Sequence, residues 1–385
     1  MKESISSDAI KDITNCISVS YNSVGGGARL RDSNLELFRI IAMMLIVAHH
    51  YVVNSGIASG IASADGTIYS NYWSFRSLFF LLFGAWGKIG INCFVLITGY
   101  FMCKSQITLR KFLKLLLEIE FYKIVFYLIF LLTGYQSFSV KTFITGVFPI
   151  TSVSTGFVSC YLLFFLFIPF LNILIKNMNE KQHLLLIGLC SFVYIVMGTL
   201  PFSVRMNYVS WFIVLYFIAS YIRLYPKKIS DNTRFWMWMM LCSFLICSLS
   251  VVACTWLGSK LNLHLHYYFV VDSNKVPAVM MGICAFMFFK NVKLRYNKFI
   301  NTVAASTFGV LLIHANSDAM RQWLWKDTLD NAGMFYSQYC YIHAIGSVLC
   351  IFAICVFIDY LRIRFLEIPF FKYWDERSSK VTKKC

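Results

Sequence analysis

The sequence predicts an all-α integral membrane protein, a bundle of about ten transmembrane helices with both termini in the cytoplasm. Three observations predict this fold. Of the 385 residues, 58% are hydrophobic and only 14% are charged, whereas a soluble domain carries roughly 25% charged residues. The apolar residues gather in runs that are long enough to cross a bilayer as helices. Lys and Arg alternate between the loops on the two sides, as the positive-inside rule describes.

Ten apolar runs are predicted to be helices, and the polar segments between them are predicted to be loops. These runs cover residues 35–53, 77–102, 112–133, 157–175, 184–200, 208–224, 235–257, 276–289, 300–316 and 341–363. Residues 1–34 are polar and contain three consecutive glycines, so they are predicted to form a flexible cytoplasmic arm. Residues 35–371 form the predicted membrane domain, and residues 372–385 a charged cytoplasmic tail.

The distribution of basic residues supports this topology and argues against nucleic-acid binding. The segments assigned to the cytoplasm hold 25 Lys and Arg residues, and the opposite loops hold 7. A miscounted pair of helices would scramble such an alternation, so the formal charge of +17 is explained as a topology signal. The thirteen cysteines form no CxxC pattern and lie mostly in apolar runs. We therefore expect neither a metal site nor a disulfide framework.

The first predicted helix carries Arg39 and His50, eleven residues apart within one apolar run. Eleven steps of ~100° return to within ~20° of the start, so both side chains lie on one face, ~16 Å apart along the axis. Glu36, three residues before Arg39, can pair with its guanidinium. Ionisable side chains inside a bilayer are costly and often functional. The alternative is an interfacial ion pair together with a hydrogen-bonded structural histidine.

Polar side chains also occur in the second, ninth and tenth predicted helices. Thr98 and Tyr100 supply hydroxyls near the cytoplasmic end of the second helix, in a glycine-containing run that equally suits helix packing. His314 lies near the outer end of the ninth, where it could share a site with His50 or be a structural histidine. In the tenth, Asp359 and Arg362 have the spacing of an ion pair.

The third predicted helix is preceded by a basic cluster of Arg110, Lys111 and Lys114. Guanidinium and ammonium groups suit contact with phosphate. A plain topology signal is the alternative interpretation of the same three residues.

These residues carry a resemblance to a known family. The run LELFRIIAMMLIVAHH resembles the first helix of the membrane acyltransferase-3 family, whose signature is L-[DE]-x-x-R followed, after ten residues, by His; here these positions are Leu35, Glu36, Arg39 and His50. Residues 94–100 are similar to the second signature of the family, with Thr98 in place of the usual serine. Many members carry R-x-x-R near the third helix, where this chain has Lys111 and Lys114. The chain resembles the stand-alone, polysaccharide-modifying form.

The resemblance implies a membrane O-acyltransferase in the bacterial cytoplasmic membrane. It implies that an acyl group, most often acetyl, moves from cytoplasmic acyl-CoA to a sugar hydroxyl of an envelope polysaccharide or its lipid-linked precursor. On this hypothesis His50 is the general base or nucleophile, and Arg39 with Glu36 guides the donor. Arg110, Lys111 and Lys114 would hold its phosphates, and His314, Thr98 and Tyr100 would support the acceptor side. No bound cofactor is expected, because acyl-CoA is a substrate. The rival interpretation is a transporter or flippase of lipid-linked glycan without covalent chemistry.

Overall fold

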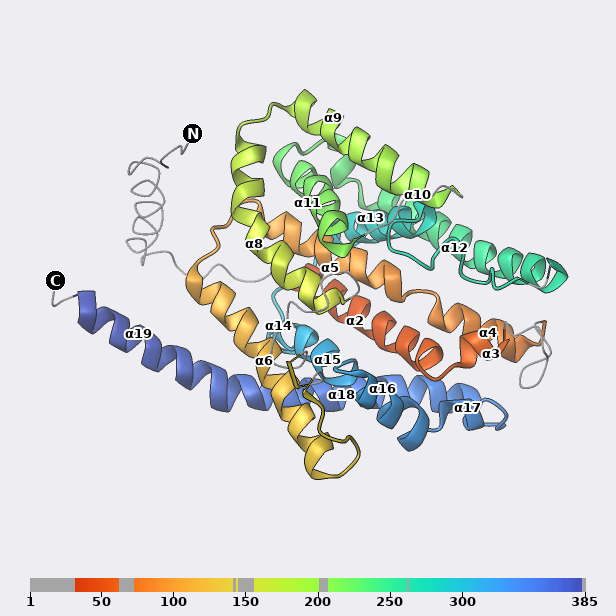
Figure 1. Ribbon diagram of the computed structural model, residues 1–385. Helices are drawn as coiled ribbons and strands as arrows, with labels where there is room; N and C mark the ends of the chain where they lie inside the picture. The colour runs from red at the N-terminus through yellow and green to blue at the C-terminus, as the bar shows by residue number, and fades with distance from the viewer. Residues whose placement is uncertain are drawn as a thin grey trace, which may run out of the picture.

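The computed structural model describes residues 32–61, 73–140, 143–144, 156–200, 207–261 and 263–382, and these ranges contain helices and no strand (Figure 1). The first half contains α2 (Ser33–Val53), α3 (Ile57–Ile61), α4 (Phe75–Gly84), α5 (Gly87–Met102), α6 (Leu109–Leu132), α8 (Phe157–Lys176), α9 (Glu180–Ser191), η2 (Phe192–Val196) and α10 (Met197–Thr199). The second half contains α11 (Tyr208–Leu224), η3 (Lys228–Asp231), α12 (Thr233–Leu261), α13 (Val276–Asn291), α14 (Lys298–Ala305), α15 (Thr307–His314), α16 (Asp318–Gln322), η4 (Trp323–Thr328), α17 (Asn331–Met334), α18 (Cys340–Arg362), η5 (Ile363–Glu367) and α19 (Ile368–Thr382).

The all-α membrane class is confirmed, and the count of ten spans stays a prediction. Six of the described helices are long and apolar enough to cross a bilayer, and a seventh results if one bent pair is a single span. That pair is Lys298–His314 with Asp318–Thr328, which meet at 92°. Tyr208–Leu224 and Val276–Asn291 are apolar but shorter. Helix α6 is long enough but carries six charged residues. The cytoplasmic placement of the termini also remains a prediction.

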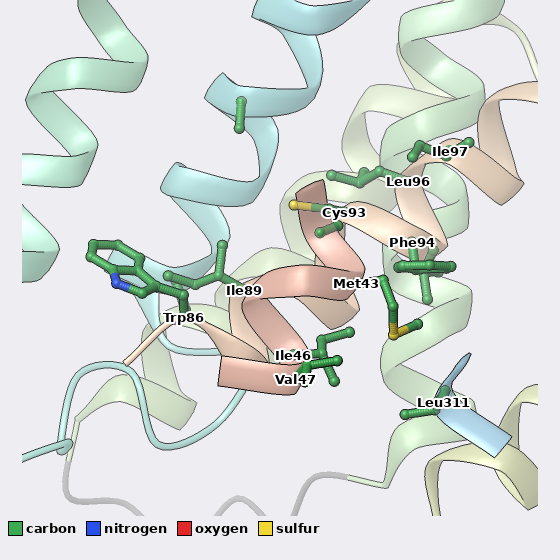
Figure 2. Packing of buried hydrophobic residues seen from close by; sticks show 14 of the residues in the cluster. Met43, Ile46, Val47, Trp86, Ile89, Cys93, Phe94, Leu96, Ile97 and Leu311 are labelled. Carbon is green, nitrogen blue, oxygen red and sulfur yellow. The ribbon is translucent and has the colours of Figure 1, made fainter. Parts of the chain in front are cut away.

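Helices α2 and α5 form the centre of the bundle. Figure 1 shows α5 between α11 and α2, and it also packs against α13. Figure 2 shows the contact between α2 and α5, where Met43 and Ile46 lie near Ile89 and Phe94 in a core of buried apolar side chains. Burying such side chains is worth roughly 1.5–3 kcal/mol each in water, but in a bilayer close packing takes over much of this role.

Two glycines of α5 explain how closely it approaches α2. A Cβ at Gly87 would lie 2.3 Å from Cγ of His49, and one at Gly90 would lie 2.9 Å from the carbonyl oxygen of Ala42. Side chains at these positions would force the helices apart. Small residues at helix contacts serve this purpose in membrane bundles. The predicted run at 77–102 is interrupted at Ala85 and Trp86 between α4 and α5, and the two helices together make one candidate span, Phe75–Met102.

Helices cross both predicted ends of the membrane domain, whose bounds stay a prediction. The expected arm, residues 1–34, lies outside the described residues up to position 31, and Ser33 and Asn34 already belong to α2. At the other end, α18, η5 and α19 follow one another without a gap (Figure 1). The expected boundary between residues 371 and 372 falls inside α19, because the helix continues through the charged segment to Thr382.

A buried cluster of charged side chains joins α6 to the end of α18. Nε of Arg362 lies 2.8 Å from Asp359, Nη1 lies 2.9 Å from Glu367, and Nη2 lies 3.2 Å from Glu118 on α6. The hydroxyl of Tyr122 donates to Asp359 across 2.8 Å. The predicted Asp359–Arg362 ion pair is confirmed, and the link to α6 is a finding of the structure.

Candidate functional site

Arg39 and His50 occupy one uninterrupted helix, as their spacing predicts. Helix α2 runs from Ser33 to Val53 without a break. Nη1 of Arg39 lies 3.1 Å from Oε2 of Glu36, so the predicted pair is present. The Glu36 side chain is 7% exposed and that of Arg39 is 23% exposed. The carboxylate therefore anchors a guanidinium that stays partly exposed.

A pair of hydroxyls lies near Arg39. The hydroxyl of Tyr161 on α8 lies 3.0 Å from Oγ1 of Thr98 on α5, and Thr98 also donates to the Phe94 carbonyl at 3.0 Å. Arg39 is close enough to act electrostatically on Tyr161. The sequence predicted Thr98 as a supporting residue. No sequence pattern pointed to Tyr161, because it lies within an apolar run. Packing of α8 places its hydroxyl next to Thr98.

His50 and His314 form a hydrogen-bonded pair between α2 and α15. Nδ1 of His50 lies 2.9 Å from Nε2 of His314, and Nδ1 of His314 lies 2.6 Å from the carbonyl oxygen of Val310. His314 is fully buried, while His50 is partly buried. The prediction that the two histidines share a site agrees with this geometry.

The hydrogen-bond chain determines which ring nitrogen of His50 is free. A carbonyl oxygen only accepts, so Nδ1 of His314 carries its proton. In the neutral pair, Nε2 of His314 then accepts from Nδ1–H of His50. Nε2 of His50 is left with an unshared electron pair. The partner of one imidazole nitrogen thus sets the chemistry of the other.

Aromatic side chains surround this pair on the side of η4. The ring of Trp325 lies 6.2 Å from that of His314 and 6.0 Å from that of Tyr51, and the Tyr51 hydroxyl lies 2.8 Å from Nδ1 of His343. The indole N–H of Trp325 is buried and has no hydrogen-bond partner among the described residues. None of these three residues was expected at the site, and Trp325 reaches it because the bend after His314 returns η4 to α2.

Charged groups near His50 come from several helices. Lys88 at the start of α5 and Arg321 on α16 lie within electrostatic range of its imidazole, as do the neighbouring histidines. Nζ of Lys88 donates to the Tyr208 hydroxyl at 2.7 Å, and Arg321 pairs with Asp318 at 2.7 Å. His49, ~100° around the helix from His50, forms a hydrogen bond with the Gly84 carbonyl at 2.6 Å instead.

The predicted donor cluster lies apart from this site, against the C-terminal helix. Arg110 pairs with Asp375 at 3.0 Å and Lys114 with Glu367 at 2.6 Å. Nζ of Lys111 donates to the Ser105 hydroxyl and to the Gln106 backbone carbonyl, each across 2.7 Å. These three cations therefore already have partners.

Tyr100 lies at the far end of α5 from Lys88. Its hydroxyl accepts from Nη1 of Arg223 at 2.6 Å, and the guanidinium of Arg223 lies 4.5 Å from the ring centroid. Tyr100 also lines a pocket of about 410 Å³ at the start of α2, together with Lys290 and Lys293. Tyr100 thus belongs to a basic site at this end of the bundle and not to the surroundings of His50.

The described residues offer no group of three or more His, Cys, Asp or Glu side chains that could hold a metal ion. An imidazole with a free ring nitrogen can take a proton or act as a nucleophile.

Comparison with protein families gives one match. A family described as "Acyltransferase domain" covers residues 32–361 of this chain. This range starts at the residue before α2 and ends within α18, so it includes both histidines and Arg39. Neither curated proteins nor solved structures give a match.

Proposed function

Because the chain belongs to the membrane acyltransferase-3 family, we propose that it transfers an acyl group, most often acetyl in this family, from acyl-CoA to a sugar hydroxyl of an envelope polysaccharide. The membrane acyltransferase class follows from the family. The donor, the acceptor and the bacterial cytoplasmic membrane as location are proposals.

The hydrogen bond from His50 to His314 is the observation that carries this proposal. It leaves Nε2 of His50 unprotonated in the neutral pair. A sugar hydroxyl is a weak nucleophile, and a positioned base that removes its proton during attack gives typically 10²–10⁴-fold acceleration. An imidazole held in one tautomer at a membrane-embedded position suits this task.

The proposed transfer has two stages, attack on the thioester and loss of the thiolate. Nε2 of His50 takes the proton of the sugar hydroxyl while the oxygen attacks the thioester carbonyl carbon. The tetrahedral intermediate then collapses, the carbon–sulfur bond breaks, and the departing thiolate takes the proton back from His50. The products are the sugar ester and free coenzyme A. In the covalent variant, Nε2 itself attacks the thioester carbonyl carbon and expels the coenzyme A thiolate. The sugar hydroxyl then attacks the acyl-imidazole, the carbon–nitrogen bond breaks, and the hydroxyl proton passes to the thiolate.

Arg39 and Glu36 are proposed to guide the donor. The Glu36 carboxylate fixes the guanidinium, which keeps 23% of its side chain exposed. A planar, permanently charged fork suits a carbonyl or phosphate oxygen better than an ammonium does. Thr98 and its partner Tyr161 are proposed to supply hydroxyl donors beside the same path.

The test is covalent transfer by the purified protein in nanodiscs. Acetyl-CoA labelled in the acetyl group and a cell-envelope polysaccharide should yield labelled polysaccharide whose repeat unit is one acetyl group heavier by mass spectrometry. A protein that only moves lipid-linked glycan would leave the mass unchanged while changing the membrane side of the glycan. That result would refute the transferase proposal in favour of the flippase.

Replacing His314 tests the hydrogen-bond chain directly. In His314→Leu, Nδ1–H of His50 loses its acceptor, and we expect kcat to fall about 10- to 100-fold, the equivalent of one positioned hydrogen bond. His314→Gln retains an amide oxygen that can accept from His50, so it should recover part of this loss. The measurement is kcat and KM for acetyl transfer, with thermal unfolding as a check. Equal activity of the Leu and Gln variants would show that His314 only fills space.

A further inference from the structure

The pocket at the start of α2 is a second site, separate from the histidine pair. Its volume is about 410 Å³, within the range of small-molecule pockets. It lies between the first residues of α2, the end of α5 and the segment after α13, and its lining includes Asp32, Ser33, Tyr100 and Lys290. The distribution of basic loops predicts that this end of the bundle faces the cytoplasm.

The charges around this pocket are mostly positive. Lys290 and Lys293 line it. Lys290 pairs with the largely exposed Asp231 at 3.1 Å, and Lys293 is exposed and forms no ion pair with any described residue. Arg223 donates to the hydroxyl of Tyr100, which lines the pocket. Nε of Arg223 is buried without a hydrogen-bond partner among the described residues. An anionic ligand in the pocket would therefore be attracted by Lys290 and Lys293 in the lining and by Arg223 next to Tyr100.

The remaining lining suits a nucleotide more than a bare phosphate. Tyr296 is 54% exposed at the edge of the pocket, and an exposed aromatic ring can stack on a base, which is worth about 1–3 kcal/mol in single-stranded nucleic-acid complexes. Asp32 supplies a carboxylate, the group that accepts from ribose hydroxyls in dinucleotide sites. Cations, an aromatic face and one carboxylate together match a phosphorylated nucleoside.

The geometry points to this pocket as the binding site for the nucleotide end of acyl-CoA. This inference rests on the proposed acyl transfer and moves the donor's phosphates away from Arg110, Lys111 and Lys114, which are paired in the structure. Helix α2 connects the pocket to the reaction site: Leu35 lines it, and His50 follows ~22 Å further along the axis. The long pantetheine arm of coenzyme A would run beside Arg39 and bring the thioester to His50.

The experiment measures binding of coenzyme A itself, independently of turnover. Isothermal titration on protein in nanodiscs would compare the native chain with Lys290→Glu/Lys293→Glu. We expect the double variant to weaken binding about 100-fold, since two charge-assisted contacts become repulsive. Lys176→Glu/Lys181→Glu is the matched control, because both lysines are exposed on the side predicted to be cytoplasmic and make the same charge change. It should bind as the native protein does. Lys290→Gln/Lys293→Gln, which introduces no repulsion, should weaken binding less while leaving thermal unfolding unchanged.

Two outcomes would overturn the inference. If a variant with Arg110, Lys111 and Lys114 replaced loses coenzyme A binding while the Lys290/Lys293 variants keep it, the donor binds at that cluster. If coenzyme A binding is unaffected and the Lys290/Lys293 variants instead lose phosphatidylglycerol from the nanodisc, the pocket holds a lipid headgroup. Binding of coenzyme A without transfer to any polysaccharide would leave the pocket standing and refute the proposed function alone.

Discussion

His50→Ala should lower acetyl transfer about 10²- to 10⁴-fold, the usual contribution of a general base. The physical reason is that Nε2 of His50 is the ring nitrogen left free when Nδ1 donates to His314. Without it, the acceptor hydroxyl loses the nitrogen that is proposed to take its proton. The measurement is kcat with labelled acetyl-CoA and polysaccharide, together with coenzyme A binding, which should be retained because the alanine lies far from the pocket at Lys290.

His264→Ala is the control for this experiment, since His264 is an exposed histidine in the segment before α13. It should transfer acetyl groups at the native rate. Near-native transfer by His50→Ala, at equal protein levels, would contradict the role given to His50. Incubation of native protein with labelled acetyl-CoA alone separates the two chemical forms of that role. Label retained on the protein indicates a covalent acyl-imidazole, and its absence indicates a base.

Arg362→Met should destabilise the folded protein by about 3–5 kcal/mol, the cost of removing one partner from a buried ion pair. The Arg362 side chain is 7% exposed and contacts three carboxylates, one of which, Asp359, is fully buried. Without the guanidinium, these carboxylates would repel one another in a site of low polarity. Helix α6 would also lose its ionic link to α18 through Glu118.

Thermal unfolding in nanodiscs measures this effect, with Arg364→Met as the matched control. Arg364 is exposed on the following turn, so its loss should stay within roughly ±0.5 kcal/mol. Adding Asp359→Asn and Glu118→Gln to Arg362→Met should recover part of the stability, because it removes the unpaired charges. Identical unfolding of Arg362→Met and Arg364→Met would show that the cluster does not stabilise the bundle.

Local patterns explain which parts of the site were predictable. Arg39, Glu36 and His50 lie within one helix, so periodicity alone places their side chains and pairs two of them. His314 was a candidate because an imidazole in an apolar run is costly, but its contact with His50 joins segments 264 residues apart. The basic cluster at Arg110 could not be assessed from sequence, since its partners Asp375 and Glu367 lie on the C-terminal helix.

The sequence by itself determined the membrane class, the family and the shared helix of Arg39 and His50, because composition and helical spacing are properties of short segments. The tertiary structure alone decided which nitrogen of His50 is free, which lysines line a pocket and which carboxylates hold Arg362. These depend on contacts between distant helices. Packing, through close approaches such as that at Gly87, sets such contacts, and no local pattern encodes them.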